Sequence, residues 1–366
     1  MMHSRDRVRK TIAHEKPDRP PADGFFRAEV WTSLRAHFGT TDDDRILDAL
    51  GFDFRRAVLE PSDAFAATAA PAPVSVGVGA GTRNLVRILP NGVFEDDRGL
   101  RRVIDSEKKY FHYVSPPLEH AETPDVYQFP DPGLPERYAH LRHQVQRYKD
   151  RFMIQIETGN IFRDAWELRG YEQFLIDLHD NPGFVTRLLE RVTEHKIAEV
   201  KRMVGEGADI IQMAGDIATE KQMMISPRWW RAEIKPRLAQ VIAATRRPGV
   251  YYYFHSDGAM QLVIPDLIEI GFDIVDPMQP ECMDLLALKR AYGARITFHS
   301  TLSSQQTLPF GSVADVRAEV AARKRDLAQD GGLILAPSNV VQHDVPLPNL
   351  LALYDEVGRQ NSDGKD

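Results

Sequence analysis

The stretch Tyr251-Tyr252-Tyr253-Phe254-His255-Ser256-Asp257-Gly258 decides the fold of this chain. Its aromatic half favours a β-strand, and polar residues, a glycine and then a helical pattern follow. This order is typical of a parallel barrel strand, the barrel mouth and the next helix. His255 and Asp257 are two positions apart, so in an extended chain their side chains point to the same side. Such a pair can bind a metal or act as acid and base; a purely structural hydrogen bond is the alternative.

The same strand-then-helix order recurs over the last two-thirds of the chain. Strands are predicted at 152–157, 209–213, 250–257, 272–275, 295–298 and 333–335. Candidate strands near Pro21 and Phe54 bring the number to about eight, which predicts a (β/α)8 TIM barrel. A doubly wound sheet is the competing fold. It normally shows a glycine-rich phosphate turn after an early strand, and the sequence has no such fingerprint.

A hairpin interrupts this alternation in the N-terminal third. The segments 85–89 and 93–95 favour strands, and Pro90-Asn91-Gly92 between them favours a tight turn. The proline- and alanine-rich segment 66–80 is predicted to be a loop. We therefore expect one barrel domain over residues 1–366, with a hairpin-containing insertion at about 60–115 that lies outside the barrel.

Composition excludes several classes of protein. The 366 residues carry a net charge of -7 and no dense Lys/Arg stripe, which argues against nucleic-acid binding. Long uncharged apolar runs and a signal-peptide pattern are missing from the sequence, so we expect a cytoplasmic chain with no membrane association. The single cysteine, Cys282, excludes an intramolecular disulfide and a multi-thiolate metal site.

Polar residues follow most of the predicted strands. They are Glu157, Asp216, His255, Asp257, Gln279, His299 and Asn339. The C-terminal ends of barrel strands meet at one mouth, so these side chains are predicted to converge on one pocket. Each has a structural alternative: Asp216 as a helix cap, Asn339 as a loop-holding amide and His299 as a buried, hydrogen-bonded histidine.

Several motifs resemble the uroporphyrinogen decarboxylase superfamily. They are Pro17-Asp18-Arg19-Pro20, Gly215-Asp216-Ile217, His255-Ser256-Asp257-Gly258, Pro265-Asp266-Leu267-Ile268-Glu269-Ile270-Gly271 and Leu335-Ala336-Pro337-Ser338-Asn339. The resemblance covers nearly the whole chain and implies a distorted (β/α)8 barrel with its site at the C-terminal mouth. The superfamily contains porphyrin-pathway decarboxylases and methyltransferases that serve corrinoid proteins.

The N-terminal region departs from the decarboxylase pattern. True decarboxylases of the family have an arginine-rich segment there that binds the many carboxylates of the porphyrinogen. Here residues 23–29 contain one arginine, Arg27, and a neighbouring acid, Glu29. Eight substrate carboxylates would be poorly neutralised by this segment. The resemblance is therefore closer to the methyltransferase branch.

The resemblance also suggests a metal site. Zinc-dependent methyltransferases of the family use His-x-Cys followed by a distant Cys, and these positions are His255, Asp257 and Asn339 here. Glu157 is a further candidate ligand because it carries charge. Without thiolates the ion, zinc or another divalent metal, would be harder and more Lewis-acidic. Such an ion could polarise the oxygen of a methyl ether.

The implied function is methyl transfer from a methoxylated small molecule to a corrinoid on a partner protein. His255, Asp257 and Asp216 are the predicted catalytic residues. The predicted substrate-binding residues are Arg27, Tyr253, Gln279 and His299. A homodimer is compatible with this hypothesis.

Two alternatives stay open. In the first, His255 and Asp257 form an acid–base pair without metal and decarboxylate a small or porphyrin-like carboxylate. In the second, the barrel binds a ligand and catalyses nothing.

Overall fold

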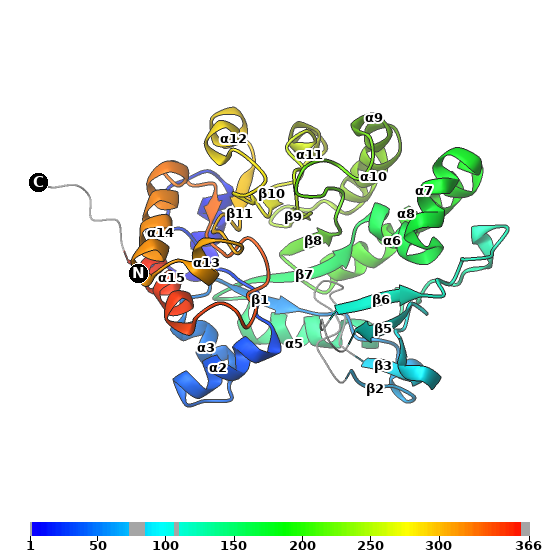
Figure 1. Ribbon diagram of the computed structural model, residues 1–366, viewed down its shortest axis with the longest axis horizontal. Coiled ribbons are helices and arrows are strands. Elements are labelled where there is room, and N and C mark those ends of the chain that lie inside the picture. Colours follow the sequence, from blue (N-terminus) through cyan, green and yellow to red (C-terminus); the bar gives the residue numbers. More distant parts are fainter. Residues whose placement is uncertain (1, 73–84, 106–109, 360–366) are drawn as a thin grey trace, which may run out of the picture.

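The structure is a computed structural model that describes residues 2–72, 85–105 and 110–359. Its centre is a curled parallel sheet (Figure 1). In spatial order the strands are β1 (Phe54–Ala57), β7 (Met153–Gly159), β8 (Ile210–Ala214), β9 (Tyr251–His255), β10 (Ile274–Asp276), β11 (Thr297–His299) and β12 (Leu333–Ile334). Chain order and spatial order agree, as expected when each strand is followed by a crossover to its neighbour.

A single residue joins the two edges of this sheet. Ala22 forms parallel bridges both to Leu335, just after β12, and to Phe52, just before β1. The predicted strand near Pro21 is therefore present only as this short eighth stave. The predicted (β/α)8 barrel is confirmed.

Strand β9 shows why the aromatic run folds as it does. Tyr253 points into the barrel interior with Phe54 and Ile210, whereas Tyr252 and Phe254 belong to the outer apolar layer. This alternation follows from the two-residue period of a strand. His255 has the same parity as Tyr253, so it also points inward, one layer nearer the mouth.

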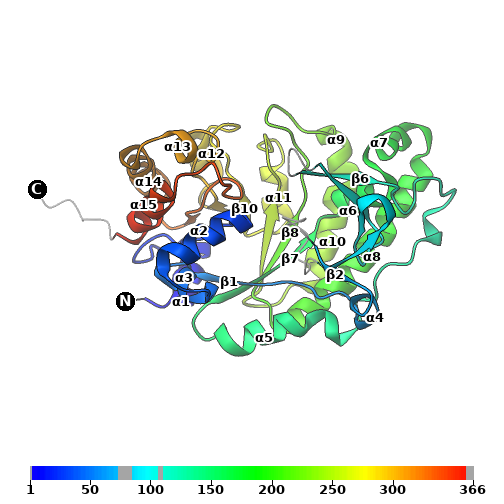
Figure 2. The same ribbon diagram turned by 60° about the horizontal axis from the view of Figure 1, so that its bottom comes forward.

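The opposite end of the barrel is closed by α1 (Ser4–Ile12), whose Val8 is packed in the interior cluster. Helices surround the sheet, with α12, α14 and α15 on one side and α6, α8 and α10 on the other (Figure 2). The longer helices are α2 (Ala28–Phe38), α5 (Ala139–Tyr148), α6 (Ile161–Arg169), α7 (Tyr171–Asp180), α8 (Pro182–Gly205), α10 (Lys235–Thr245), α12 (Leu285–Tyr292), α14 (Val313–Leu327) and α15 (Leu347–Gly358). The shorter ones are α3 (Asp43–Ala49), α4 (Asp63–Ala66), α9 (Pro227–Trp229), α11 (Ile264–Ile270) and α13 (Thr307–Phe310), with a π-helical turn at Trp230–Ile234.

Local capping fixes where the outer helices begin. The side chain of Asn181 accepts a hydrogen bond from the amide of Phe184, and Pro182 occupies the first turn of α8. Ser312 and Asp315 form a reciprocal capping box at the start of α14. No helix in the described part of the chain is both long enough and apolar enough to cross a membrane.

The N-terminal insertion is larger than the predicted hairpin. Strands β3 (Leu85–Leu89) and β4 (Val93–Glu95) pair as expected, but they belong to a five-stranded antiparallel sheet. Its other strands are β2 (Ala70–Pro71), β5 (Arg101–Asp105) and β6 (Tyr110–Val114). Of the predicted loop 66–80, residues 70–71 form β2, and 73–80 lie outside the described residues. The sheet contacts α6 through Tyr113, whose ring centroid lies 5.6 Å from that of Trp166.

Candidate active site

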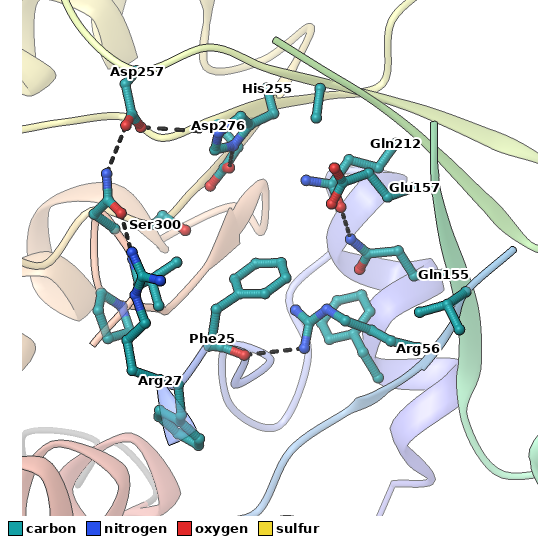
Figure 3. Close-up of a pocket in the computed structure, with 18 of the residues that line it drawn as sticks. Phe25, Arg27, Arg56, Gln155, Glu157, Gln212, His255, Asp257, Asp276 and Ser300 are labelled. Carbon is teal, nitrogen blue, oxygen red and sulfur yellow. Dashed lines mark hydrogen bonds and ion pairs between the residues drawn. The ribbon is translucent and has the colours of Figure 1, made fainter. Parts of the chain in front are cut away.

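A cavity of about 740 Å³ opens at the C-terminal ends of the strands (Figure 3). Its lining comes from the strand ends, from the segment after the Ala22 stave and from β6 of the small sheet. Glu157, Asp216, His255, Asp257, Asn339 and Arg27 all line it. The volume lies in the range that holds a drug-sized ligand.

Three side chains converge at one end of this cavity. Asp216 follows β8, His255 ends β9 and Asp257 lies two residues further on, and their ligand atoms lie within 4.8 Å of one another. The amide of Asp257 donates to Oδ1 of Asp216 at 2.9 Å, which ties the two strand ends together. Oδ1 of Asp257 is buried without a hydrogen-bond partner in the part of the chain that the structure describes, and it lies 3.9 Å from Nε2 of His255.

The His255 ring is held by a carboxylate from the next strand. Its Nδ1 donates to Oδ2 of Asp276 at 2.5 Å, which leaves Nε2 facing Asp257. Burial lowers the pKa of His255, but the hydrogen bond and charge of Asp276 outweigh it and raise the pKa to about 10. A carboxylate that orients the imidazole is the usual outer partner of a metal-binding histidine.

These residues fit a divalent ion. A nitrogen and two carboxylates converge, the ring is oriented, and one carboxylate oxygen has no hydrogen-bond partner among the described residues. Burial also raises the pKa of Asp257 to about 6, as expected where a carboxyl group lacks enough donors or cations. Asn339 contributes differently from the sequence prediction, because its Nδ2 donates to Oδ2 of Asp257 at 2.6 Å. Glu157 is not part of the converging group.

Behind His255 a buried chain of charges crosses the barrel. The second oxygen of Asp276 contacts Nδ1 of His299 at 2.7 Å, and Nε2 of His299 lies 3.0 Å from Asp23. Asp23 also pairs with Arg56 at 2.5 Å. Burial lowers the pKa of His299, but Asp276 and Asp23 raise it to about 9. Positively and negatively charged side chains alternate along this chain, so each buried charge has a partner of opposite sign. Removing one member would leave a neighbouring charge unpaired.

A second group of polar side chains lines the cavity from β7 and β8. Gln155 donates through Nε2 to Oε1 of Gln212, while Oε1 of Gln155 is buried without a hydrogen-bond partner among the described residues. Glu157 lies on the same face of β7 and opposite Gln212 in the strand register. Burial raises the pKa of Glu157, and the charges of Arg163 and His255 oppose that rise.

Three predicted substrate-binding residues do not line the cavity. Tyr253 and His299 are each 1 % exposed, and the two lie together beneath His255, with the Tyr253 hydroxyl 3.3 Å from the His299 ring. Gln279 accepts a hydrogen bond from the Gly258 amide at 3.1 Å and so supports the loop after β9. Only Arg27 of that set reaches the cavity.

The sequence predictions missed several residues of the site. They are Asp23, Arg56, Gln155, Gln212 and Asp276. Asp276 had a usable signal, because it directly follows the predicted strand 272–275 and precedes a proline. Asp23 follows a stave of one bridged residue, which leaves no periodic pattern in the sequence.

The fold and the cavity together define a barrel whose polar chemistry lies at the strand C-termini. The chain belongs to the uroporphyrinogen decarboxylase (URO-D) family, whose sequence model matches residues 104–360. This confirms the superfamily resemblance drawn from the motifs.

Two relatives are methyltransferases. Methylcobamide:CoM methyltransferase MtaA of Methanosarcina barkeri is 29% identical over 166 residues, which cover 45% of this chain and 46% of that protein. The chain thus matches less than half the length of this curated relative. A solved methyltransferase from Methanosarcina mazei shares the fold, with a TM-score of 0.68 at 18% identity over 98% of each chain.

Proposed function

We propose that this protein transfers a methyl group from a methoxylated small molecule to a corrinoid carried by a partner protein. The observation that carries the proposal is the group Asp216, His255 and Asp257 at the cavity mouth, which offers only nitrogen and oxygen ligands. Similarity to a methylcobamide:CoM methyltransferase supports a corrinoid as the reaction partner. The size of the cavity supports a substrate of one or two rings.

A divalent ion, zinc in this proposal, would be held by Nε2 of His255 and by the carboxylates of Asp257 and Asp216. When bound, it supplies Lewis acidity toward the ether oxygen of the substrate. Without thiolate ligands it stays a stronger Lewis acid than in a cysteine-rich site. That property suits cleavage of an ether better than activation of a thiol.

The chain's own residues orient the reacting groups. Asp276 fixes the ring of His255, and the Asn339 amide fixes the carboxylate of Asp257. The reaction balances as a heterolytic transfer. The ether C–O bond breaks with its electron pair left on oxygen, the corrinoid supplies the pair for the new bond to the methyl carbon, and the oxygen takes up a proton. Aromatic side chains at the cavity, including Phe25 and Trp31, hold the rest of the substrate away from water.

The test combines metal analysis with a transfer assay. Purified protein is expected to contain about one divalent ion per chain, and to convert a methoxyphenol to the demethylated product while free cob(I)alamin is consumed. His255→Ala is expected to lose both metal and turnover. Glu194→Gln, an exposed change on α8, is the control that keeps both. Wild-type protein that turns over at full rate in excess chelator would contradict the metal-assisted function.

A second function is favoured by one observation. Asp276 orients His255 as a base or acid toward Asp257, whose oxygen lies 3.9 Å from Nε2, and this arrangement needs no metal. The pair could therefore support metal-independent decarboxylation of a small carboxylate. Release of CO2 from aromatic carboxylates in the presence of chelator, lost in His255→Ala, would favour this function over methyl transfer.

A further inference from the structure

The carboxyl group of Glu157 lines the cavity without any hydrogen-bond partner among the described residues. Its Oε1 is covered, so Oε2 is the oxygen left to face the open space. Buried polar groups are nearly always paired, and an unpaired carboxyl in a cavity wall therefore calls for a ligand donor. The residue stands on β7, two strands away from His255 on β9.

Two glutamines next to Glu157 are joined by a hydrogen bond. Gln155 is 1 % exposed and Gln212 is 2 % exposed, and their amides bond to each other. Oε1 of Gln155 also lacks a hydrogen-bond partner in the described part of the chain, but Gln155 is almost fully buried, whereas Glu157 is partly exposed and a ligand can reach it. Figure 3 shows Glu157 and the two glutamines on one side of the cavity and Asp257 on the other. A ligand that contacts both sides of the cavity therefore needs one polar group toward Glu157 and a second polar group toward Asp257.

The charges around Glu157 determine which kind of ligand group can donate a hydrogen bond to its carboxyl group. Arg163 and Arg56 both act on its carboxyl group, so a cationic ligand end would be repelled there. An anionic end would meet Glu157 itself and, further along, Asp216 and Asp257. A neutral hydroxyl group avoids both repulsions and still donates a hydrogen bond.

Aromatic side chains line the same cavity as Glu157. The guanidinium carbon of Arg56 lies 3.8 Å from the centroid of the Phe25 ring, which makes a flat surface. Trp31 packs edge-on against Phe26 with centroids 5.4 Å apart. Flat aromatic surfaces suit a planar ring.

We propose that Glu157 determines substrate specificity by accepting a hydrogen bond from a hydroxyl group on the ring of a methoxyarene, while the methoxyl group lies at Asp216, His255 and Asp257. This inference rests on the proposed function for the position of the methoxyl group. It differs from the sequence prediction, which placed Glu157 among the metal ligands. A site built around an acceptor rejects ligands that lack the donor, because the acceptor is left desolvated and unpaired.

The experiment measures binding to the full-length chain rather than turnover. The probes are 2-, 3- and 4-methoxyphenol, the matching dimethoxybenzenes and 4-methoxybenzoate. Binding is followed by calorimetry and by the fluorescence of Trp31 and Trp166, which line the cavity. Wild-type protein is expected to bind at least one methoxyphenol about tenfold more tightly than its capped dimethoxybenzene.

Variants test whether Glu157 causes the preference for a methoxyphenol over its capped dimethoxybenzene. Glu157→Leu is expected to bring the two affinities within about twofold of each other, whereas Glu157→Gln keeps an acceptor oxygen and should keep most of the preference. Gln144→Leu removes a different polar side chain from the same lining, on α5, and should leave the ratio unchanged. Far-UV circular dichroism checks that each variant is folded.

Several outcomes would overturn the inference. They are a wild-type ratio near one, tighter binding of 4-methoxybenzoate than of every methoxyphenol, no binding of any methoxyphenol, or an unchanged ratio in folded Glu157→Leu. The wild-type ratio does not depend on any variant. Because binding needs no corrinoid, a ratio of tenfold without methyl transfer would refute only the proposed function, and methyl transfer with a ratio near one would refute only the role of Glu157.

Discussion

His255 and Asp276 face each other in register on neighbouring strands, and Nδ1 of the imidazole donates to the carboxylate at 2.5 Å. The carboxylate is 2 % exposed, and its other oxygen contacts His299. One aspartate thus orients the histidine at the mouth and connects it to the buried charges below. The orientation of the candidate catalytic group is set by backbone pairing between β9 and β10.

Replacing Asp276 by Asn should therefore disable the site while leaving its lining residues in place. An amide cannot hold the imidazole of His255 as a carboxylate does, so metal affinity and turnover should each fall about 10- to 100-fold. Metal titration and kcat/KM measure this. Asp284→Asn is the matched control, because an amide can still cap α12 there. Full metal content and turnover in Asp276→Asn would show that His255 needs no such partner.

The loop after His255 depends on Gly258. Its φ is +89°, and an added Cβ would lie 2.4 Å from the carbonyl oxygen of Thr219. Gly258→Ala should lower the free energy of unfolding by more than the ~1 kcal/mol expected from backbone strain alone. It should also displace the neighbouring Asp257 and weaken metal binding.

The variant Gly249→Ala separates the effect of backbone strain from the effect of the steric clash at Gly258. Its φ is +81°, but a Cβ there would meet no atom of the described residues within 4 Å. Chemical denaturation of Gly249→Ala should thus show only the strain effect, with metal binding unchanged. Equal losses of stability in the two variants would mean that the contact with Thr219 relaxes freely.

The ligand chemistry at position 257 can be tested by restoring sulfur. Asp257→Cys supplies the thiolate that the thiol-activating relatives use in the resembling position, so metal should be retained. A thiolate makes the ion softer and less Lewis-acidic, so ether cleavage should fall by at least about tenfold. Metal analysis together with kcat on a methoxyphenol measures both effects. Faster ether cleavage in Asp257→Cys would mean that the replacement of cysteine by aspartate does not serve Lewis acidity.

The sequence was sufficient to predict the barrel because most strands begin and end with strong local signals. The aromatic run of β9 followed by polar residues is one such signal, and it placed His255 and Asp257 at the mouth. The partners of a residue across the sheet are harder to predict. That Asp276 contacts two histidines depends on the register of β9, β10 and β11, which no single segment encodes.

The other predictions that differ from the structure concern how deep in the barrel a strand residue lies. Tyr253 has the same parity as His255 and was expected at the substrate, but it lies two residues earlier and so one layer deeper in the barrel. His299 was predicted just after the strand 295–298 and is the last residue of β11, yet Asp23 and Asp276 occupy both of its ring nitrogens. Parity is local information, whereas depth depends on how far each strand is shifted against its neighbours.

A last prediction concerns acid stability and the buried Glu199 on α8. Its Oε2 lies 3.2 Å from Lys196 Nζ and accepts a hydrogen bond from Thr158 at 2.5 Å. Burial alone would raise the pKa of Glu199, but the charges of Lys196 and His195 outweigh it and lower the pKa to about 2. Since the folded pKa lies below the unfolded one, this carboxylate stabilises the fold above about pH 4.3. That stabilisation is lost as the pH falls through the interval down to about 2.

Glu199→Gln should therefore lower the free energy of unfolding at pH 7 by on the order of 3 kcal/mol. The difference from wild type should shrink steadily between pH 5 and about pH 2. Lys196 keeps a second carboxylate partner, Asp164 at 2.8 Å, so the variant does not leave the ammonium unpaired. Urea denaturation across this pH range measures both quantities, with the exposed Glu194→Gln on the same helix expected to change stability by less than about 0.5 kcal/mol. A wild-type minus variant difference that is independent of pH would mean that Glu199 acts through packing rather than through its charge.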